Sequence, residues 1–169
     1  MILAKGMSAV AASAALVATS PAAALAGEPG AEAAILKYCE PLIDGSSAKQ
    51  IKDAARKDGF RDEVVAGQSV LRIGEVLVGI SDAPRVCFVQ AAPAMTLQQG
   101  FALVDTWAER HPGAVKAPAT KGPDGSPVRA WTDPARKMAL LASQQTAVSG
   151  QKVMNFILMP LPRGATAGR

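Results

Sequence analysis

The sequence predicts an α+β domain in which two N-terminal helices precede an antiparallel sheet of about five strands, packed against one helix in the order β-β-α-β-β-β. Three observations lead to this fold class. Residues 31–57 carry apolar side chains at helical spacing. Residues 69–91 and 128–160 are dense in Val, Ile, Leu and Met between turn-forming residues. Residues 97–110 form one strongly amphipathic helical pattern between these two regions.

Residues 1–26 differ in composition from the rest of the chain. Lys5 is their one charged residue, an apolar run follows it, and Ala24 and Ala26 supply the small residues of an A-x-A cleavage site. This order is typical of a secretory signal peptide. A retained anchor helix is the alternative, but the apolar run is shorter than the roughly 20 residues needed to span a bilayer. We therefore expect cleavage near Ala26–Gly27 and a periplasmic or secreted protein.

The remaining residues, 27–169, have the length of one domain with a proper core. Without Lys5, 17 of the 18 basic residues and all 14 acidic residues remain, so the net charge falls from +4 to +3. The charges are interspersed and lack the basic, aromatic-interleaved clusters of nucleic-acid-binding proteins. We expect no nucleic-acid partner and no membrane span in the mature chain.

Two helices are expected before the sheet. The first begins near residue 31, and Pro41 should end or kink it near Cys39. Ser47 and Gln50 fit a capping box that opens the second helix. Gly59 supplies the left-handed residue that closes this helix.

The expected strands are separated by turn residues. Residues 69–80 are interpreted as one long strand, bent at Gly74 or Gly79. The turn at 81–84 contains Asp and Pro, which favour a chain reversal into the next strand. The other expected strands are 85–91, 128–131, 136–145 and 151–160.

The clearest single element is the helix at 97–110. Thr96 and Gln99 form a second capping box, and the apolar stripe has a period of 3.6 residues. Residues 112–127 follow it and hold four prolines and three glycines. We expect a flexible, exposed loop there, of a length that compact domains seldom keep without a function.

The two cysteines, Cys39 and Cys87, are predicted to form a disulfide. An exported protein with an even number of cysteines favours pairing. Buried free thiols are the first alternative, and a chemical role for either thiol is the second. A reactive thiolate is favoured by a neighbouring cation, and a metal site requires several ligands. Neither pattern surrounds these cysteines in the sequence.

Two side chains are weighed as general acids or bases. His111, the only histidine, directly follows a helix in the run RHPG, which favours a C-terminal cap that interacts with the helix dipole. Glu75 lies in an apolar strand, where burial would raise its pKa. Exposure at a sheet edge is the interpretation we favour for Glu75. We assign no catalytic residue.

The remaining motifs favour structural roles. Asp105 and Glu109 lie one helical turn apart, which is typical of a solvated helix face rather than of a metal or glycosidase pair. Trp107 and Trp131 are expected in the core or at its rim. The sequence contains no nucleophile elbow, phosphate loop, dinucleotide fingerprint or H-E-x-x-H motif. We therefore expect no cofactor and no metal.

Several short motifs together resemble small exported bacterial proteins of uncharacterised function. These motifs are the signal peptide, YCEPL in the first helix, AKQIKDAARKDGF, the strand RVCFV, and a helix followed by a β meander. The resemblance covers most of residues 33–159. It implies the order of elements and supports a Cys39–Cys87 pair, and it carries over no catalytic or binding residue.

The function expected from these features is that of an exported, non-enzymatic domain that binds a partner protein or an envelope component. The candidate contacts are the 112–127 loop and an exposed sheet edge, which accepts an added strand. One alternative is a small exported hydrolase that uses Glu75 or His111. Another is a small-molecule carrier with an apolar hollow between the 97–110 helix and the sheet.

Overall fold

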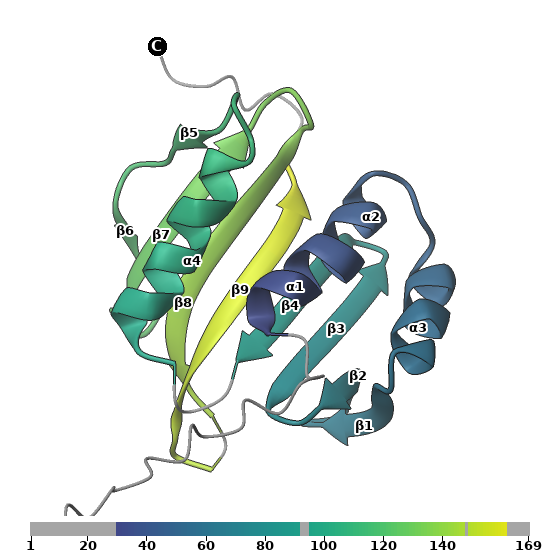
Figure 1. The fold of residues 1–169 in the computed structure, drawn as a ribbon. Helices are drawn as coiled ribbons and strands as arrows, with labels where there is room; N and C mark the ends of the chain where they lie inside the picture. The colour runs from purple at the N-terminus through teal and green to yellow at the C-terminus, as the bar shows by residue number, and fades with distance from the viewer. Residues whose placement is uncertain (1–29, 92–94, 148, 162–169) are drawn as a thin grey trace, which may run out of the picture.

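A computed structural model describes residues 30–91, 95–147 and 149–161. In these residues a nine-stranded antiparallel sheet carries its helices on one face (Figure 1). The strand order is β1-β2-β3-β4-β9-β8-β7, and both β5 and β6 pair with β7. The strands are β1 (Arg61–Val65), β2 (Gln68–Ile73), β3 (Val76–Asp82), β4 (Arg85–Ala91), β5 (Val115–Lys116), β6 (Thr120–Lys121), β7 (Pro127–Asp133), β8 (Met138–Thr146) and β9 (Lys152–Pro160).

The α+β class is as predicted, but the sheet is larger than the expected five strands. The expected long strand at 69–80 is a hairpin, because Gly74 adopts a positive φ of 49° and turns the chain between β2 and β3. The charged run at 61–65 forms β1 and pairs with β2 through a turn at Ala66 and Gly67. Two further short strands, β5 and β6, lie within residues 112–127 and pair with β7.

The N-terminal helical region differs from the expectation at its end. Three consecutive helical segments run through residues 31–43: α1 (Ala31–Ala34), the π-helical η1 (Ile35–Cys39) and α2 (Glu40–Ile43). Pro41 therefore does not end the helix near Cys39. Proline has no N–H to donate to the preceding turn, and the wider π-turn directly before it lets the helical path continue.

Both predicted capping boxes are present. In α3 (Ala48–Lys57), the Ser47 side chain accepts from the Gln50 N–H and the Gln50 side chain accepts from the Ser47 N–H. In α4 (Leu97–Glu109), Thr96 and Gln99 do the same. Each box satisfies backbone donors that a helix start otherwise leaves free.

The helical segments and the sheet enclose the core. The expectation that the sheet packs against one helix is wrong, because α1, α2 and α3 also contact it, over β2, β3, β4 and β9. The α4 helix covers β7 and β8 (Figure 1). Val104 and Trp107 fill the space below α4, and the Met154 side chain fits against Gly100, where a Cβ would meet it at 2.2 Å. The hollow expected between the 97–110 helix and the sheet is therefore occupied by core side chains.

The structure contains the predicted disulfide. Cys39 in η1 and Cys87 in β4 are bonded, with their Cα atoms 5.2 Å apart. Both residues are buried in the core. The bond therefore ties the first helical region to the middle of the sheet, across the interface that holds the core.

A second tie joins the first helical region to the end of α3. The Tyr38 hydroxyl donates to Asp58 Oδ2 at 2.6 Å, and Lys37 contacts the same oxygen at 2.9 Å. Burial and this hydrogen bond raise the pKa of Tyr38 above its usual value. The hydrogen bond from Tyr38 and the ammonium group of Lys37 lower the pKa of Asp58.

None of the helices in the described part of the chain is long and apolar enough to cross a membrane. The predicted signal peptide, residues 1–26, lies outside the described residues.

Candidate functional site

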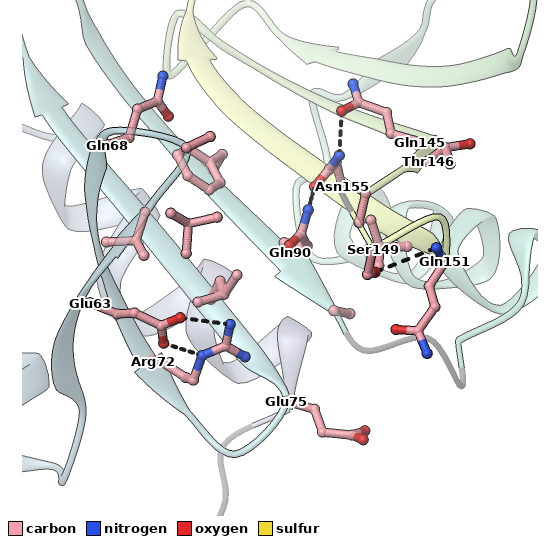
Figure 2. Close-up of a pocket in the computed structure, with 18 of the residues that line it drawn as sticks. Glu63, Gln68, Arg72, Glu75, Gln90, Gln145, Thr146, Ser149, Gln151 and Asn155 are labelled. Atoms are coloured by element: carbon pink, nitrogen blue, oxygen red, sulfur yellow. Dashed lines mark hydrogen bonds and ion pairs between the residues drawn. The ribbon is translucent and has the colours of Figure 1, made fainter.

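A hollow of about 940 Å³ opens on the face of the sheet opposite the helices. Its lining residues come from β1, β2, β3, β4, β8 and β9 and from the β2–β3 and β8–β9 turns (Figure 2). On β2, on β9 and on most of β4 they occupy alternate positions. Leu77, Phe88 and Asn155 line the hollow, whereas their neighbours Val78, Val89 and Phe156 lie in the core. Strand alternation thus separates the hollow from the core.

The floor of the hollow is apolar. Phe88 is the one aromatic residue of this lining, and the residue that faces it on β3 is Gly79. A Cβ at Gly79 would lie 1.9 Å from Phe88 Cε1, so the ring lies directly over the glycine backbone. Aliphatic side chains make up much of the remaining lining: Val70, Leu77, Val86, Val153 and Ile157. This floor can accept the apolar groups of a ligand.

A row of three amides crosses the hollow. Gln90 Nε2 donates to Asn155 Oδ1 at 3.1 Å, and Asn155 Nδ2 donates to Gln145 Oε1 at 2.7 Å (Figure 2). Asn155 is only 8% exposed, whereas the two glutamines at its sides are more accessible. Each primary amide has two N–H donors and an oxygen with two lone pairs. The two bonds of the row therefore leave donors and acceptors on all three side chains for a ligand.

The wall formed by β1 and β2 carries an ion pair. Arg72 Nε donates to Glu63 Oε2, and the Arg72 NH2 group donates to Glu63 Oε1 at 3.2 Å. Both side chains are part-exposed. Arg72 is the one cationic residue among the lining side chains, and its guanidinium is engaged by Glu63. The hollow therefore presents neutral polar groups and apolar surface, with little unpaired charge apart from Glu75.

Glu75 and His111, the two weighed acid–base residues, lie in different places. Glu75 is exposed in the β2–β3 turn at the rim of the hollow, and no hydrogen bond of its carboxylate is recorded in the described part of the chain. His111 is buried on the helix side. The sheet separates the two residues, so they do not share a site.

His111 closes α4, as the sequence indicates. Its Nδ1 lies 2.7 Å from the Trp107 carbonyl oxygen, and its ring stacks on the Trp107 indole. Arg136 NH1 lies 2.7 Å from His111 Nε2. A guanidinium only donates, so Nε2 accepts this bond and Nδ1 carries the proton that is donated to the carbonyl. This arrangement holds the His111 ring in place as a helix cap.

Arg136 and Glu40 complete a buried polar cluster around His111. Glu40 Oε1 accepts from Trp107 Nε1 at 2.8 Å, and Glu40 Oε2 accepts from Arg136 NH1 at 2.8 Å. Arg136 also contacts Asp44. The cluster links α2, α4 and the β7–β8 turn. Its polar side chains form hydrogen bonds with one another. We assign it a structural role.

The carboxylates of α4 have separate environments. Asp105 accepts from Trp131 Nε1 at 2.9 Å and from Arg129, whereas Glu109 is exposed. In the described ranges, no three His, Cys, Asp or Glu side chains are close enough together to hold a metal ion. A second depression, of about 420 Å³, lies beside this contact. Fewer residues line this depression than line the hollow on the other face, so it offers fewer contacts to a ligand.

The two predicted contact surfaces lie away from the hollow's centre. Residues 112–127 form one edge of the sheet through β5 and β6, and most of their side chains are exposed. At the other edge, β1 pairs only with β2 among the described strands. This second edge borders the hollow, because Glu63 and Val65 of β1 line it.

Of the residues that line the hollow, Glu75 alone was a candidate from the sequence, and the amide row was not predicted. Its signal is the presence of polar residues at alternate positions of otherwise apolar strands, as at Gln90, Asn155 and Gln145. The comparisons add no family to this picture: no family model matches the chain, and no significant match was found among curated proteins or solved structures.

Proposed function

We propose that this chain is an exported, non-enzymatic binding domain, and that its ligand, a segment of a partner protein or an envelope component, occupies the hollow on the helix-free face. The observation that carries the proposal is the amide row, Gln90–Asn155–Gln145, set in an apolar floor. Ligand sites are typically concave and apolar, with a few convergent polar groups that fix orientation.

The export part of the proposal rests on the predicted signal peptide at residues 1–26. A disulfide between Cys39 and Cys87 suits an oxidising compartment. N-terminal sequencing of the protein recovered from the periplasm or medium tests this step. We expect the mature chain to begin at Gly27; a chain that retains residues 1–26 in the membrane would contradict export.

A small-molecule carrier is the second candidate, and the volume of the hollow favours it. Ligand sites typically enclose about 300–1,000 Å³, and the hollow measures about 940 Å³. The hydrolase alternative has less support, because Glu75 and His111 lie on opposite faces of the sheet and His111 is engaged as a helix cap.

Photo-crosslinking in the living cell tests whether the hollow is the binding site. A benzoylphenylalanine replaces Gln151, an exposed residue that lines the hollow, or Thr106, an exposed residue of α4 on the opposite face. We expect adducts from position 151 that disappear when Asn155 is also replaced by Leu, and none from position 106. Adducts that form equally at both positions, or at neither, would overturn the proposal.

A further inference from the structure

We infer that the ligand of the hollow is an uncharged polypeptide segment in an extended conformation. This inference rests on the proposed function and narrows it to one class of ligand. It is drawn from three properties of the hollow: its charge, its remaining hydrogen-bonding capacity, and its dimensions.

Charge excludes acidic ligands. Among the described residues, Arg72 is the only cation that lines the hollow, and it is paired with Glu63. Phosphate and carboxylate ligands are recognised by free Arg or Lys groups or by convergent N–H donors, and binding here would require breaking this ion pair. Glu75 at the rim also repels anions. A ligand without net charge fits these walls best.

Hydrogen-bonding capacity disfavours a purely apolar ligand. An acyl chain would cover the amide row of Gln90, Asn155 and Gln145 and leave its free donors and acceptors unsatisfied. Each buried unsatisfied group costs about 1–3 kcal/mol. Peptide groups present an N–H and a C=O together, as the amides do. A polypeptide backbone therefore satisfies the row while its side chains cover the apolar floor.

The floor favours peptide side chains over sugar rings. Apart from Phe88, the apolar lining consists of Val, Leu, Ile and Ala side chains. Sugar hydroxyls would lose hydration against these aliphatic groups without gaining partners. Alternate side chains of an extended segment point to the same face, so apolar residues at every second position would meet Phe88, Leu77 and Ile157.

The dimensions set the length of the segment. Beside the wall to which β1 contributes, the floor of the hollow extends from β2 across β3, β4 and β9 to β8. Four strand spacings of about 4.8 Å give a path of about 19 Å, which about six extended residues of about 3.3 Å each would cover.

Side-chain amide NMR with defined probes tests this inference. The probes are a capped hexapeptide of alternating valine and serine, the same peptide with lysine or aspartate in place of serine, an N-acetylglucosamine tetramer, and monolauroylglycerol. We expect the neutral peptide to shift the side-chain amide resonances of Gln90, Gln145 and Asn155. The aspartate peptide should bind at least about tenfold more weakly, because Arg72 is already paired with Glu63 and Glu75 repels anions. The lysine peptide should also bind more weakly than the neutral one, because its ammonium groups lose hydration beside an apolar floor.

Two variants and a control localise the binding. Asn155→Leu should weaken binding of the neutral peptide about tenfold, the loss expected for one or two neutral hydrogen bonds. Gln145→Leu lies at an exposed position and should weaken binding while leaving the fold intact. Ser81→Ala, on the same strand as Leu77 but outside the lining, should leave binding unchanged.

The outcomes separate this inference from the proposed function. Amide shifts caused by the oligosaccharide or the lipid, but not by the neutral peptide, would overturn the polypeptide inference and leave the hollow as a binding site. Absence of shifts with every probe would also overturn it. The crosslinks from position 151 then decide independently whether the hollow is a site at all.

Discussion

Reducing the Cys39–Cys87 bond is expected to remove about 4 kcal/mol from the free energy of unfolding. The two cysteines are 48 positions apart, and the chain-entropy relation gives about this value for a closed loop of that length. Small domains have a net stability of about 5–15 kcal/mol. The reduced protein should therefore be marginally stable.

The measurement compares urea unfolding of the oxidised protein with that of protein reduced while unfolded and refolded in reductant. The two forms share one sequence, so no side-chain cavity enters the difference. The dependence on urea should also steepen on reduction, because an unfolded chain without the cross-link exposes more surface. The Cys39→Ala/Cys87→Ala variant serves as the control and should unfold identically with and without reductant.

A difference below about 1 kcal/mol would refute the reasoning, since the chain-entropy relation predicts several times more. Such a result would mean that the unfolded chain keeps the first helical region near β4 without the bond. An unchanged urea dependence would point to the same conclusion.

Three further predictions follow from single contacts. Tyr38 is the only tyrosine in the sequence, so phenolate absorbance reports its titration alone. Because the pKa of Tyr38 is raised in the folded state, its phenol should stay protonated at pH about 10, where an exposed tyrosine titrates. The stability that this raised pKa contributes is complete below pH about 10 and declines as the pH rises above that value. The Tyr38→Phe variant should not show this decline. Titration of Tyr38 at pH about 10 in the folded protein would contradict the prediction. Gly79→Ala should lower the free energy of unfolding by about 1–3 kcal/mol, because the new Cβ displaces the Phe88 ring. In a double-mutant cycle, the same change in a Phe88→Ala background should cost little. An equal cost in both backgrounds would exclude the ring contact as the cause. Arg136→Met should cost about 1–2 kcal/mol in urea unfolding, because Glu40 loses its cationic partner while it keeps the hydrogen bond from Trp107 Nε1. Adding Glu40→Gln should recover part of this loss, and no recovery would show that the ion pair is not what Arg136 contributes.

The features predicted correctly depend on residues close together in the sequence. Ser47 with Gln50, and Thr96 with Gln99, lie three positions apart, and both pairs form capping boxes. The disulfide could be predicted because two cysteines allow only one intramolecular pair. The strand at 85–91 has the predicted bounds, although the turn before it is shorter than the expected 81–84, because Ser81 and Asp82 belong to β3.

The features missed depend on contacts between distant segments. The run at 61–65 has three charged residues and no apolar alternation, and it becomes a strand because β2 is available as its partner. The hollow is assembled from six strands, and no two members of its amide row are closer than ten positions in the chain. Sequence periodicity shows which face a residue occupies on its own strand, but not which strands become neighbours.

The arrangement of all helices on one face of the sheet has a consequence for how freely the sequence can change. The core, the disulfide and the His111 cluster lie on the helix side, and the amide row lies on the other. Substitutions at Gln90 and Gln145 can therefore change the polar lining of the hollow with little effect on folding. The helix-free face can be redesigned by a few exchanges over an unchanged core, which makes this scaffold a practical starting point for engineered binders.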